Sequence, residues 1–229
     1  KRGSMEAELV ALAGRLHAAG ARATFVFSQA TPAWMASAFA AAGAATRVMD
    51  FRRPAAAALA LSRMLQAARP ALVHFHFVRA YSPLVAIARA AGARVIVHDH
   101  ITLGQPSSPD QPRRGAAAAL VLRGCKRARA ALLNRFVDRR IAVSRFVADS
   151  VQCAEYVAAQ KLVVIENGID LQRFGAAEGA TLRRELGAGP RRKIVACVSR
   201  LAPEKGVDVL IRVMARVGRD ALLLLAGDG

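Results

Sequence analysis

The sequence has few cysteines, and they are far apart. Cys125, Cys153 and Cys197 are odd in number and form no C-x-x-C pair. This spacing argues against a disulfide framework and against a zinc site made of cysteines. We therefore expect all three to be reduced, buried thiols of a cytoplasmic protein.

Long apolar runs are missing as well. The longest, at residues 116–122 and 221–227, are shorter than the roughly 18 residues of a membrane-spanning helix. Residues 1–4 lead directly into an amphipathic pattern, so no secretory leader is indicated. The chain starts at Lys1 rather than at a Met, and we expect its true start to be missing.

Aromatic and acidic residues are also scarce. Aromatic residues make up 5% of the chain and hydrophobic residues 54%, which is typical of sheets covered by alanine-rich helices. Lys and Arg number 34 against 16 Asp and Glu, so the formal net charge is +18. A surplus of this size predicts an anionic partner: a nucleic acid, a phosphorylated substrate or an acidic lipid surface.

Extended and helical patterns alternate along the chain. Strands are expected at residues 23–27, 47–51, 71–77, 93–98, 140–143, 162–165, 194–198 and 221–225. Helices are expected at residues 4–19, 31–43, 54–68, 82–92, 113–135, after Ser144, around 182–186 and at 207–217. The alternation predicts parallel sheets with helices on their faces, which defines the α/β class. A polar loop containing Pro and Gly is predicted at residues 102–112.

The composition changes near residue 170. Asn167-Gly168 is a turn signal, and residues 175–190 are rich in Gly and in charge. We expect a first domain at residues 1–170, a linker at 171–190 and a second domain at 191–229. The last part holds one strand–helix–strand unit, which cannot bury both faces of its sheet alone. We therefore expect the second domain to be truncated.

Six short motifs follow one another in a specific order. They are Gly3-Ser4-Met5-Glu6, His98-Asp99, Ile141-Ala-Val-Ser144, Val164-Ile-Glu-Asn-Gly-Ile-Asp170 followed by Phe174, Ser199-Arg-Leu-Ala-Pro-Glu-Lys-Gly206 and Ala226-Gly-Asp-Gly229. In this order and spacing the chain resembles glycosyltransferase family 4. Members of that family are retaining enzymes of the two-domain GT-B fold that use nucleotide-activated sugars. The resemblance covers nearly the whole chain.

The resemblance implies a particular architecture. Residues 1–170 would form the Rossmann-like, acceptor-side domain without its first strand. Residues 191–229 would begin the Rossmann-like domain that binds the nucleotide sugar, as a truncated strand–helix–strand unit. The family's pair of donor-contacting glutamates would lie beyond Gly229. We expect this fragment alone to be inactive, because most donor contacts would be missing.

Arg200 and Lys205 are the first candidate site residues. They bracket a Pro-containing turn at the carboxyl end of a predicted strand, where ligands bind in open α/β sheets. In the family that the chain resembles, the matching residues bind the donor diphosphate. Two fixed cations would stabilise the negative charge that develops on this leaving group. The alternative is a solvated surface pair.

Histidines form the second group of candidates. His98 ends a β-branched strand, and the resemblance implies that it contacts the donor sugar close to the reaction centre; the alternative is a structural histidine. Asp99 would orient a neighbouring group or cap the following loop. His74, His76, His98 and His100 form two H-x-H pairs, each with both rings on one face of an extended chain. This arrangement raises a zinc-dependent hydrolase as an alternative.

Small and acidic residues complete the candidates. Gly3-Ser4 resembles the paired-glycine loop of the family, with Ser in place of the second Gly. Such residues before a helix let backbone N–H groups approach a phosphate, although they also serve as plain helix caps. Glu6 matches the acidic residue of that motif, or is a first-turn carboxylate favoured by the helix dipole. Asn167 and Gly168 would shape the hinge and cleft wall or form a simple turn, with Gly168 left-handed.

Basic residues gather on one side of the helix predicted at residues 113–135. On a helical projection they are Arg113, Arg123, Lys126, Arg127 and Arg135, opposite Val121, Leu122, Cys125, Leu132 and Leu133. Arg114 and Arg129 depart from this separation. The basic face suits an anionic lipid surface. The alternative is a solvated face on a helix that packs against the core.

These patterns predict a retaining glycosyltransferase that moves a sugar from a nucleotide-diphosphate sugar to a glycan, lipid-linked or small-molecule acceptor. The nucleotide sugar is a co-substrate; no cofactor and no metal are assigned, because two cations can replace a metal ion electrostatically. We expect a cytoplasmic protein, peripheral at the inner face of the cell membrane. Two other classes stay open: an α/β protein that binds nucleic acid or an anionic surface without catalysis, and an epimerase or phosphorylase of the same fold. Nucleic acid is less expected, because the sequence has no zinc-finger, helix-turn-helix or aromatic-rich strand pattern.

Overall fold

The computed structural model describes residues 4–102, 124–125, 128–169, 171–174, 179–217 and 221–229. The chain forms two compact units, Lys1–Ile169 and Asp170–Gly229. The second unit therefore takes in the residues that were expected to form a linker.

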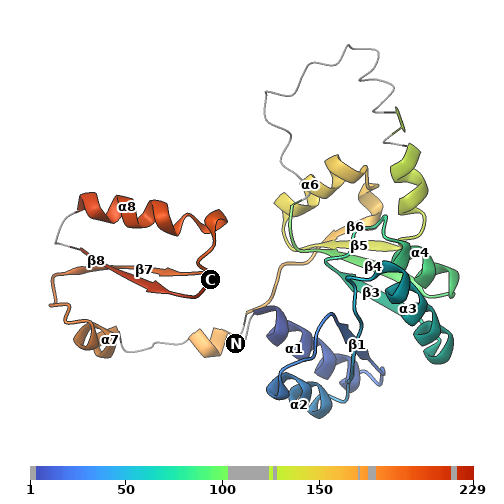
Figure 1. Ribbon diagram of the computed structural model, residues 1–229, viewed down its shortest axis with the longest axis horizontal. Coiled ribbons are helices and arrows are strands. Elements are labelled where there is room, and N and C mark those ends of the chain that lie inside the picture. The colour runs from blue at the N-terminus through green and yellow to red at the C-terminus, as the bar shows by residue number, and fades with distance from the viewer. Residues whose placement is uncertain (1–3, 103–123, 126–127, 170, 175–178, 218–220) are drawn as a thin grey trace. The chain divides into compact units, whose positions relative to one another are not determined.

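The first unit alternates helices and strands, as the sequence predicts (Figure 1). Its elements are α1 (Ser4–Ala18), β1 (Thr24–Phe27), α2 (Ala33–Ala41), β2 (Ala45–Val48), α3 (Pro54–Ala68), β3 (Leu72–His76), α4 (Pro83–Ala90), β4 (Arg94–Asp99), β5 (Arg139–Ala142), α6 (Arg145–Glu155), η1 (Ala159–Lys161) and β6 (Leu162–Val164). Residues 128–134 are helical as well. The caps follow the sequence signals: Ser82 Oγ accepts a hydrogen bond from the backbone N–H of Leu84, and Ser144 Oγ accepts one from Val147.

All strand pairs of this unit are parallel. β1 pairs with β2, and a second sheet has the order β3-β4-β5-β6. Within the described residues no hydrogen-bonded pair joins the two sheets. In the second sheet Phe75 lies beside Val97, and Val97 lies beside Arg140. These three residues therefore share one face of the sheet, because neighbours in register point the same way.

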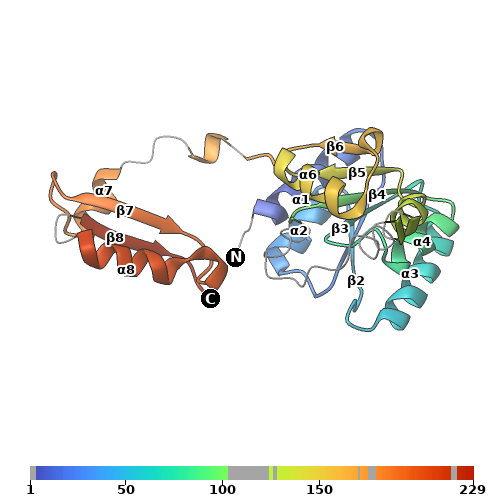
Figure 2. The same ribbon diagram turned by 90° about the horizontal axis from the view of Figure 1, so that it is seen from above.

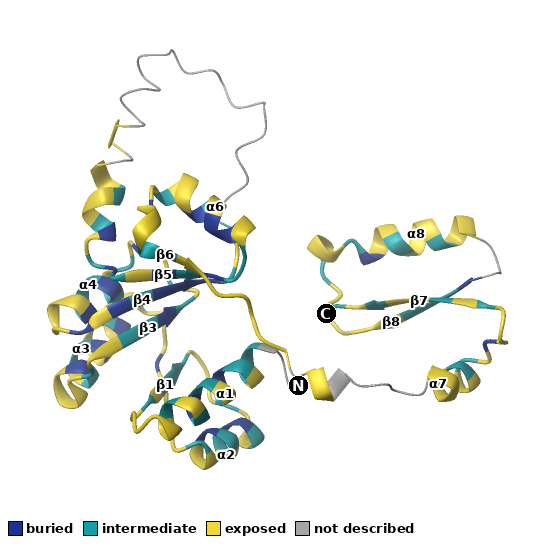
Figure 3. Cartoon of the chain, turned by 180° about the vertical axis from the view of Figure 1, so that it is seen from behind, coloured by how far each residue is buried: buried dark blue, intermediate teal, exposed yellow. Residues whose placement is uncertain are grey.

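That face carries the main core. α3 and α4 lie beside each other (Figures 1 and 2), and their apolar stripes pack against β3 and β4. The buried members of this core are Met49, Ala57, Leu61, Leu65, Phe75, Ala80, Val85, Ala88, Val95, Val97 and Val137. A smaller cluster joins α6 to β5 through Ala142, Val147, Ala148 and Val151. Buried residues accordingly run along β4 (Figure 3).

A third cluster holds α1 and α2 against the first sheet. Its buried residues are Leu9, Ala13, Met35 and Phe39. The ring of Phe39 lies 4.6 Å from that of Phe25 and 5.7 Å from that of Phe27, centroid to centroid. Because one face of each helix supplies these residues, the amphipathic spacing of the sequence accounts for the packing.

The second unit is a single strand–helix–strand motif preceded by short helices. It consists of η2 (Leu171–Phe174), α7 (Gly179–Glu185), β7 (Lys193–Val198), η3 (Pro203–Lys205), α8 (Val207–Val217) and β8 (Ala221–Ala226). β7 and β8 pair in parallel. Many apolar side chains of the unit stay exposed, among them Val195, Val198, Val209, Ile211, Val213, Val217 and Leu225. A two-stranded sheet with one packed helix has too little surface to cover them.

Several expectations are corrected by the structure. Cys125 and Cys153 are exposed rather than buried; Cys153 lies on α6 two residues beyond the buried Val151, and therefore on the outer side of the helix. The second strand lies at Ala45–Val48 instead of residues 47–51, because β2 pairs with Thr24–Phe27. Leu132, expected on an apolar face, is 54% exposed.

Other expectations lie outside the described residues. These are the loop at residues 103–112 and most of the basic helix, whose described parts are 124–125 and 128–135. Among the helices that the structure describes, none has both the length and the apolar character needed to cross a membrane.

Two leucines of α3 provide a matched test of the core. Leu61 is 5% exposed and Leu59 is 53% exposed. We expect Leu61→Ala to lower the free energy of unfolding by about 2–5 kcal/mol, because it leaves a cavity, and Leu59→Ala to change it by less than about 0.5 kcal/mol. Urea unfolding followed by the fluorescence of Trp34, the single tryptophan, measures both. Equal losses would contradict this placement of α3.

Candidate functional site

Four histidines gather at the carboxyl ends of β3 and β4. His74 and His76 are two residues apart on β3, and His98 and His100 are two apart on or just after β4. His76 is the register partner of His98. All four therefore lie on the sheet face opposite the core of α3 and α4. We call them the histidine cluster.

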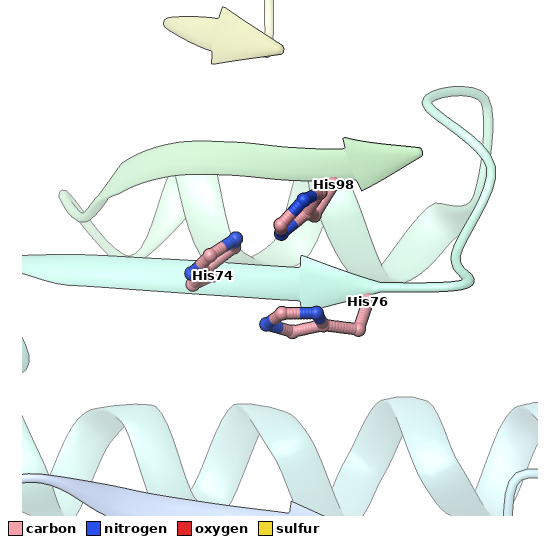
Figure 4. Close-up of side chains that lie close together, drawn as sticks. All are labelled: His74, His76 and His98. Carbon is pink, nitrogen blue, oxygen red and sulfur yellow. The ribbon is translucent and has the colours of Figure 1, made fainter. Parts of the chain in front are cut away.

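The rings of the histidine cluster are in direct contact. The centroids of His74 and His98 lie 5.4 Å apart in a stacked arrangement, and those of His98 and His100 lie 4.2 Å apart. Nδ1 of His76 and Nε2 of His100 are 3.0 Å apart and share a hydrogen bond. Figure 4 shows His74, His76 and His98 grouped where the two strands run side by side.

Burial keeps these rings uncharged. It lowers the pKa of His74 to about 4, with a further contribution from the charge of His100. Burial and the neighbouring histidines lower the pKa of His76 to about 3 and that of His98 to about 4. Burial also lowers the pKa of His100. At neutral pH the cluster is therefore a group of neutral imidazoles, each with a lone pair on one ring nitrogen.

His98 has no hydrogen-bond partner for either ring nitrogen within the described residues, and Nε2 of His74 has none either. His98 is only 5% exposed. Buried polar groups are normally paired, and each exception costs free energy. A ligand with polar groups or positive charge would satisfy these atoms. The structure thus places His98, a residue singled out in the sequence, in a setting that suits ligand contact.

Asp99 belongs to a different arrangement on the opposite face of the sheet. Its carboxylate accepts hydrogen bonds from Arg140 at 2.7 and 3.0 Å. Arg140 is fully buried and also pairs with Glu155 of α6. Burial would lower the pKa of Arg140, but the hydrogen bonds and charges of Asp99 and Glu155 raise it above its ordinary value. Asp99 thus binds an arginine instead of capping the next loop.

Sequence reasoning missed Arg140 and Glu155. The only signal was a charged residue at the start of a strand predicted to lie in a parallel sheet, where strands are usually buried on both faces. Such a residue needs partners of opposite charge, but nothing in the sequence says which carboxylates the fold brings to it. Glu155 is fifteen residues away and reaches Arg140 only because α6 folds back over β5.

The basic candidates lie in the second unit. Arg200 follows the carboxyl end of β7, and Lys205 ends the short helix η3 before α8. Both side chains are exposed, and Arg200 pairs with Glu204 at 3.1 Å. Between Lys205 and α8, Gly206 has a φ of 62°, a left-handed conformation that glycine adopts at little cost.

Gly227 and Gly229 allow the end of the chain to lie close to the backbone of Ser199 and Leu201. The backbone N–H of Ser199 donates to the carbonyl of Ala226 at 3.1 Å, and that of Leu201 donates to Asp228 at 2.9 Å. A Cβ added to Gly227 would lie 1.7 Å from the carbonyl oxygen of Ser199. The Ala226-Gly-Asp-Gly229 motif therefore pairs with the segment that leads into Arg200.

The remaining candidates are scattered. Gly3 lies outside the described residues, Ser4 begins α1, and Glu6 is half-buried in its first turn. Asn167 and Gly168 are exposed in the irregular segment between β6 and η2. Gly168 does not have the expected left-handed backbone, and no atom beyond its chain neighbours lies within 4 Å of a Cβ added there. The expected turn is therefore wrong: residues 165–169 contain no turn and no regular secondary structure.

Fold and site together define a class. The chain has two α/β units with parallel sheets, and its candidates His98 and Arg200 lie at or just after the carboxyl ends of strands, where open α/β sheets bind ligands. The family model of glycosyltransferase family 4 matches residues 5–173. The chain belongs to this family, and the resemblance found in the sequence is confirmed.

Curated relatives are similar over shorter stretches. The D-inositol 3-phosphate glycosyltransferase of Segniliparus rotundus is 38% identical over 96 residues, which are 40% of this chain and 21% of that protein. A GDP-mannose-dependent monoacylated alpha-(1-6)-phosphatidylinositol monomannoside mannosyltransferase of Corynebacterium glutamicum is 38% identical over 71 residues, which are 28% of this chain and 19% of that protein. The matched stretches thus span about a fifth of the length of these relatives.

Solved structures show the fold. HepE of Anabaena, in complex with UDP-glucose, is 19% identical with a TM-score of 0.67, and the match covers 100% of this chain and 58% of that one. A glycosyltransferase of Rickettsia africae is 17% identical with a TM-score of 0.71, and the match covers 99% and 57%. The predicted GT-B type of α/β fold is confirmed.

The buried arginine gives a test with a neighbouring control. Arg140→Met leaves the carboxylates of Asp99 and Glu155 without their cation, so we expect the free energy of unfolding to fall by about 3–5 kcal/mol. Arg139→Met removes an exposed arginine from the same strand and should change it by less than about 0.5 kcal/mol. Urea unfolding measures both. A stable Arg140→Met protein would show that the carboxylates do not need the arginine.

Proposed function

We propose that the chain is part of a retaining glycosyltransferase that moves a sugar from a nucleotide-diphosphate sugar to an acceptor. Membership of glycosyltransferase family 4 supports the transferase activity. The fold likeness to HepE, solved in complex with UDP and with UDP-glucose, supports a nucleotide donor. The relatives named as D-inositol 3-phosphate glycosyltransferases support a phosphorylated acceptor, which also suits the net charge of +18.

The observation that carries the proposal is the position of Arg200 and Lys205. Both follow the carboxyl end of a strand in a parallel strand–helix–strand unit, where open α/β sheets bind their ligands. Breaking the bond between the sugar and the diphosphate leaves negative charge on the diphosphate oxygen. The guanidinium and ammonium groups stabilise this charge as it develops, and the reaction needs no metal ion for that purpose.

His98 supports the sugar side of the reaction. Its buried ring nitrogens have no partner in the described chain, and sugar hydroxyls can both donate to and accept from a neutral imidazole. We assign His98 a contact with the donor sugar, and no role as a general base. The pair of Asp99 with Arg140 on the other face of β4 holds the backbone that carries this ring.

Exposed arginines of the second unit allow a matched test of the donor site. Arg200 and Arg212 are 73% and 72% exposed, and each pairs with a carboxylate four residues away. In the full-length enzyme, Arg200→Ala and Lys205→Ala should each lower kcat by about 10²–10³-fold, as expected for the loss of one donor to the leaving group. Arg212→Ala should leave kcat unchanged.

Sugar transfer from radiolabelled nucleotide sugars measures these rates, and NMR of the product gives its anomeric configuration. Normal turnover by Lys205→Ala would remove the donor-site assignment. A product whose anomeric configuration is inverted relative to the donor would overturn the retaining mechanism.

We further propose that the protein associates with an anionic membrane surface through the basic face at residues 113–135. The sequence places five basic residues on that face. Each Lys or Arg close to an anionic leaflet contributes about 1 kcal/mol to the free energy of membrane binding. Such a location would bring the enzyme to a lipid-linked acceptor.

Cosedimentation with vesicles tests this location. We expect binding to vesicles that contain phosphatidylglycerol and none to pure phosphatidylcholine vesicles, because the attraction is electrostatic. Replacing Arg123, Lys126 and Arg127 by Gln should abolish the binding. Replacing Arg52, Arg53 and Arg63 removes the same charge elsewhere and should preserve most of it. Equal losses in the two triple variants would show that net charge alone binds the vesicles.

A further inference from the structure

The histidine cluster has the composition and spacing of a metal site. The chain has five histidines, and four of them share one face of the sheet. One ring nitrogen from each of His74, His76 and His98 lies within 4.8 Å of the other two. These residues come from two strands that pair in register, so the sheet itself holds the three rings together.

The unpaired ring nitrogens point to a missing partner. Nε2 of His74 and both ring nitrogens of His98 are buried without a hydrogen bond in the described part of the chain. Burying polar atoms in this way costs free energy unless a ligand satisfies them. A cation can accept one lone pair from each of several rings at once, which pairs one nitrogen of each ring. Neutral imidazole binds a metal ion through the lone pair of one ring nitrogen.

The distances suit a tetrahedral ion. Zinc binds histidine nitrogens at about 2.0–2.1 Å, which places two such nitrogens about 3.3 Å apart in a tetrahedral site. The observed spacing of up to 4.8 Å is wider, so coordination requires the rings to rotate about χ1 and χ2 toward one another. Imidazole ligands favour Zn²⁺, Cu²⁺ and Ni²⁺ over the hard cations Mg²⁺ and Ca²⁺.

His100 occupies the position of an orienting partner. Its Nε2 shares a hydrogen bond with Nδ1 of His76 at 3.0 Å. Histidines that bind metal almost always use their second ring nitrogen for such a bond, which fixes the ring and the tautomer. His76 would then coordinate through Nε2.

We propose that His74, His76 and His98 bind one divalent transition-metal ion, with Zn²⁺ the best fit, and leave its fourth position open to water. The metal site does not depend on the proposed transferase function. A consequence does rest on that function: an ion held by His98 excludes this ring from the donor sugar, so metal binding inhibits sugar transfer.

The test uses protein without a polyhistidine tag, stripped with a chelator and then titrated with Zn²⁺ by calorimetry and with Co²⁺ by visible absorption. We expect one ion per chain, intense tetrahedral Co²⁺ bands and a higher unfolding temperature with Zn²⁺, since an ion that binds only the folded state stabilises it. His74→Gln and His98→Gln should abolish the Co²⁺ bands. His100→Gln should weaken binding by about 10–100-fold.

Two control proteins separate this site from incidental binding. His17→Gln changes a histidine of α1 outside the cluster and should bind like the unchanged protein. The double variant Cys125→Ser and Cys153→Ser removes the exposed thiols and should also keep one ion. The fluorescence of Trp34 checks that each variant is folded. Absence of stoichiometric binding to the unchanged protein, or binding that survives His74→Gln but not the cysteine changes, would overturn the site.

Measurements of sugar transfer distinguish the metal site itself from the proposed inhibition by the bound metal. Zn²⁺ at one equivalent should inhibit sugar transfer by the full-length enzyme, and a chelator should restore it. Binding without inhibition would keep the metal site and overturn the assignment of His98 to the donor sugar. Failure of transfer in every condition, with the Co²⁺ bands present, would count against the proposed function and not against the site.

Discussion

The parallel pairing of β3, β4 and β5 is the constraint on which the first unit depends. Successive side chains of a strand point to opposite faces, so the register divides each strand into two sets. Phe75 and Val97 go to the core beneath α3 and α4, whereas His76 and His98 go to the other face. A slip of one residue would exchange the two sets. Core and candidate site are therefore specified by the same hydrogen bonds.

The buried Arg140 adds a second link between the core face of the sheet and the face that carries the histidine cluster. Arg140 binds the carboxylate of Asp99, which is the next residue after His98. Removing a charge from water is expensive, and the two carboxylates with their hydrogen bonds offset that cost. The ion pairs thus fix the carboxyl end of β4 from one face while the ring of His98 projects from the other. The buried ion pair and the candidate ligand-binding ring therefore belong to two adjacent residues, Asp99 and His98.

The two units carry different chemistry. The first offers neutral, buried imidazoles, which suit sugar hydroxyls or a transition-metal ion. The second offers exposed cations after a strand, with glycines that let two backbone segments approach closely. A nucleotide sugar has both kinds of group, a polar sugar and an anionic diphosphate. In the two proposals above, His98 is the residue of the first unit at which metal and sugar would compete.

Periodicity alone predicted most of the elements, because apolar spacing and caps are local properties: Ser82 and Ser144 cap helices where the pattern placed them. Motif order also led to the right family and fold. Sequence signals of the same local kind gave wrong predictions where long-range packing decides the backbone conformation or the burial of a residue. Gly168 lacks its expected turn, and Cys153 is exposed because α6 turns another face to β5. The sequence by itself determined the alternation of strands and helices and the presence of paired histidines. Only the tertiary structure decided that β3 and β4 lie in register, which joins two separate H-x-H pairs into one cluster, and that Glu155 reaches Arg140, because both contacts depend on which distant segments the fold brings together.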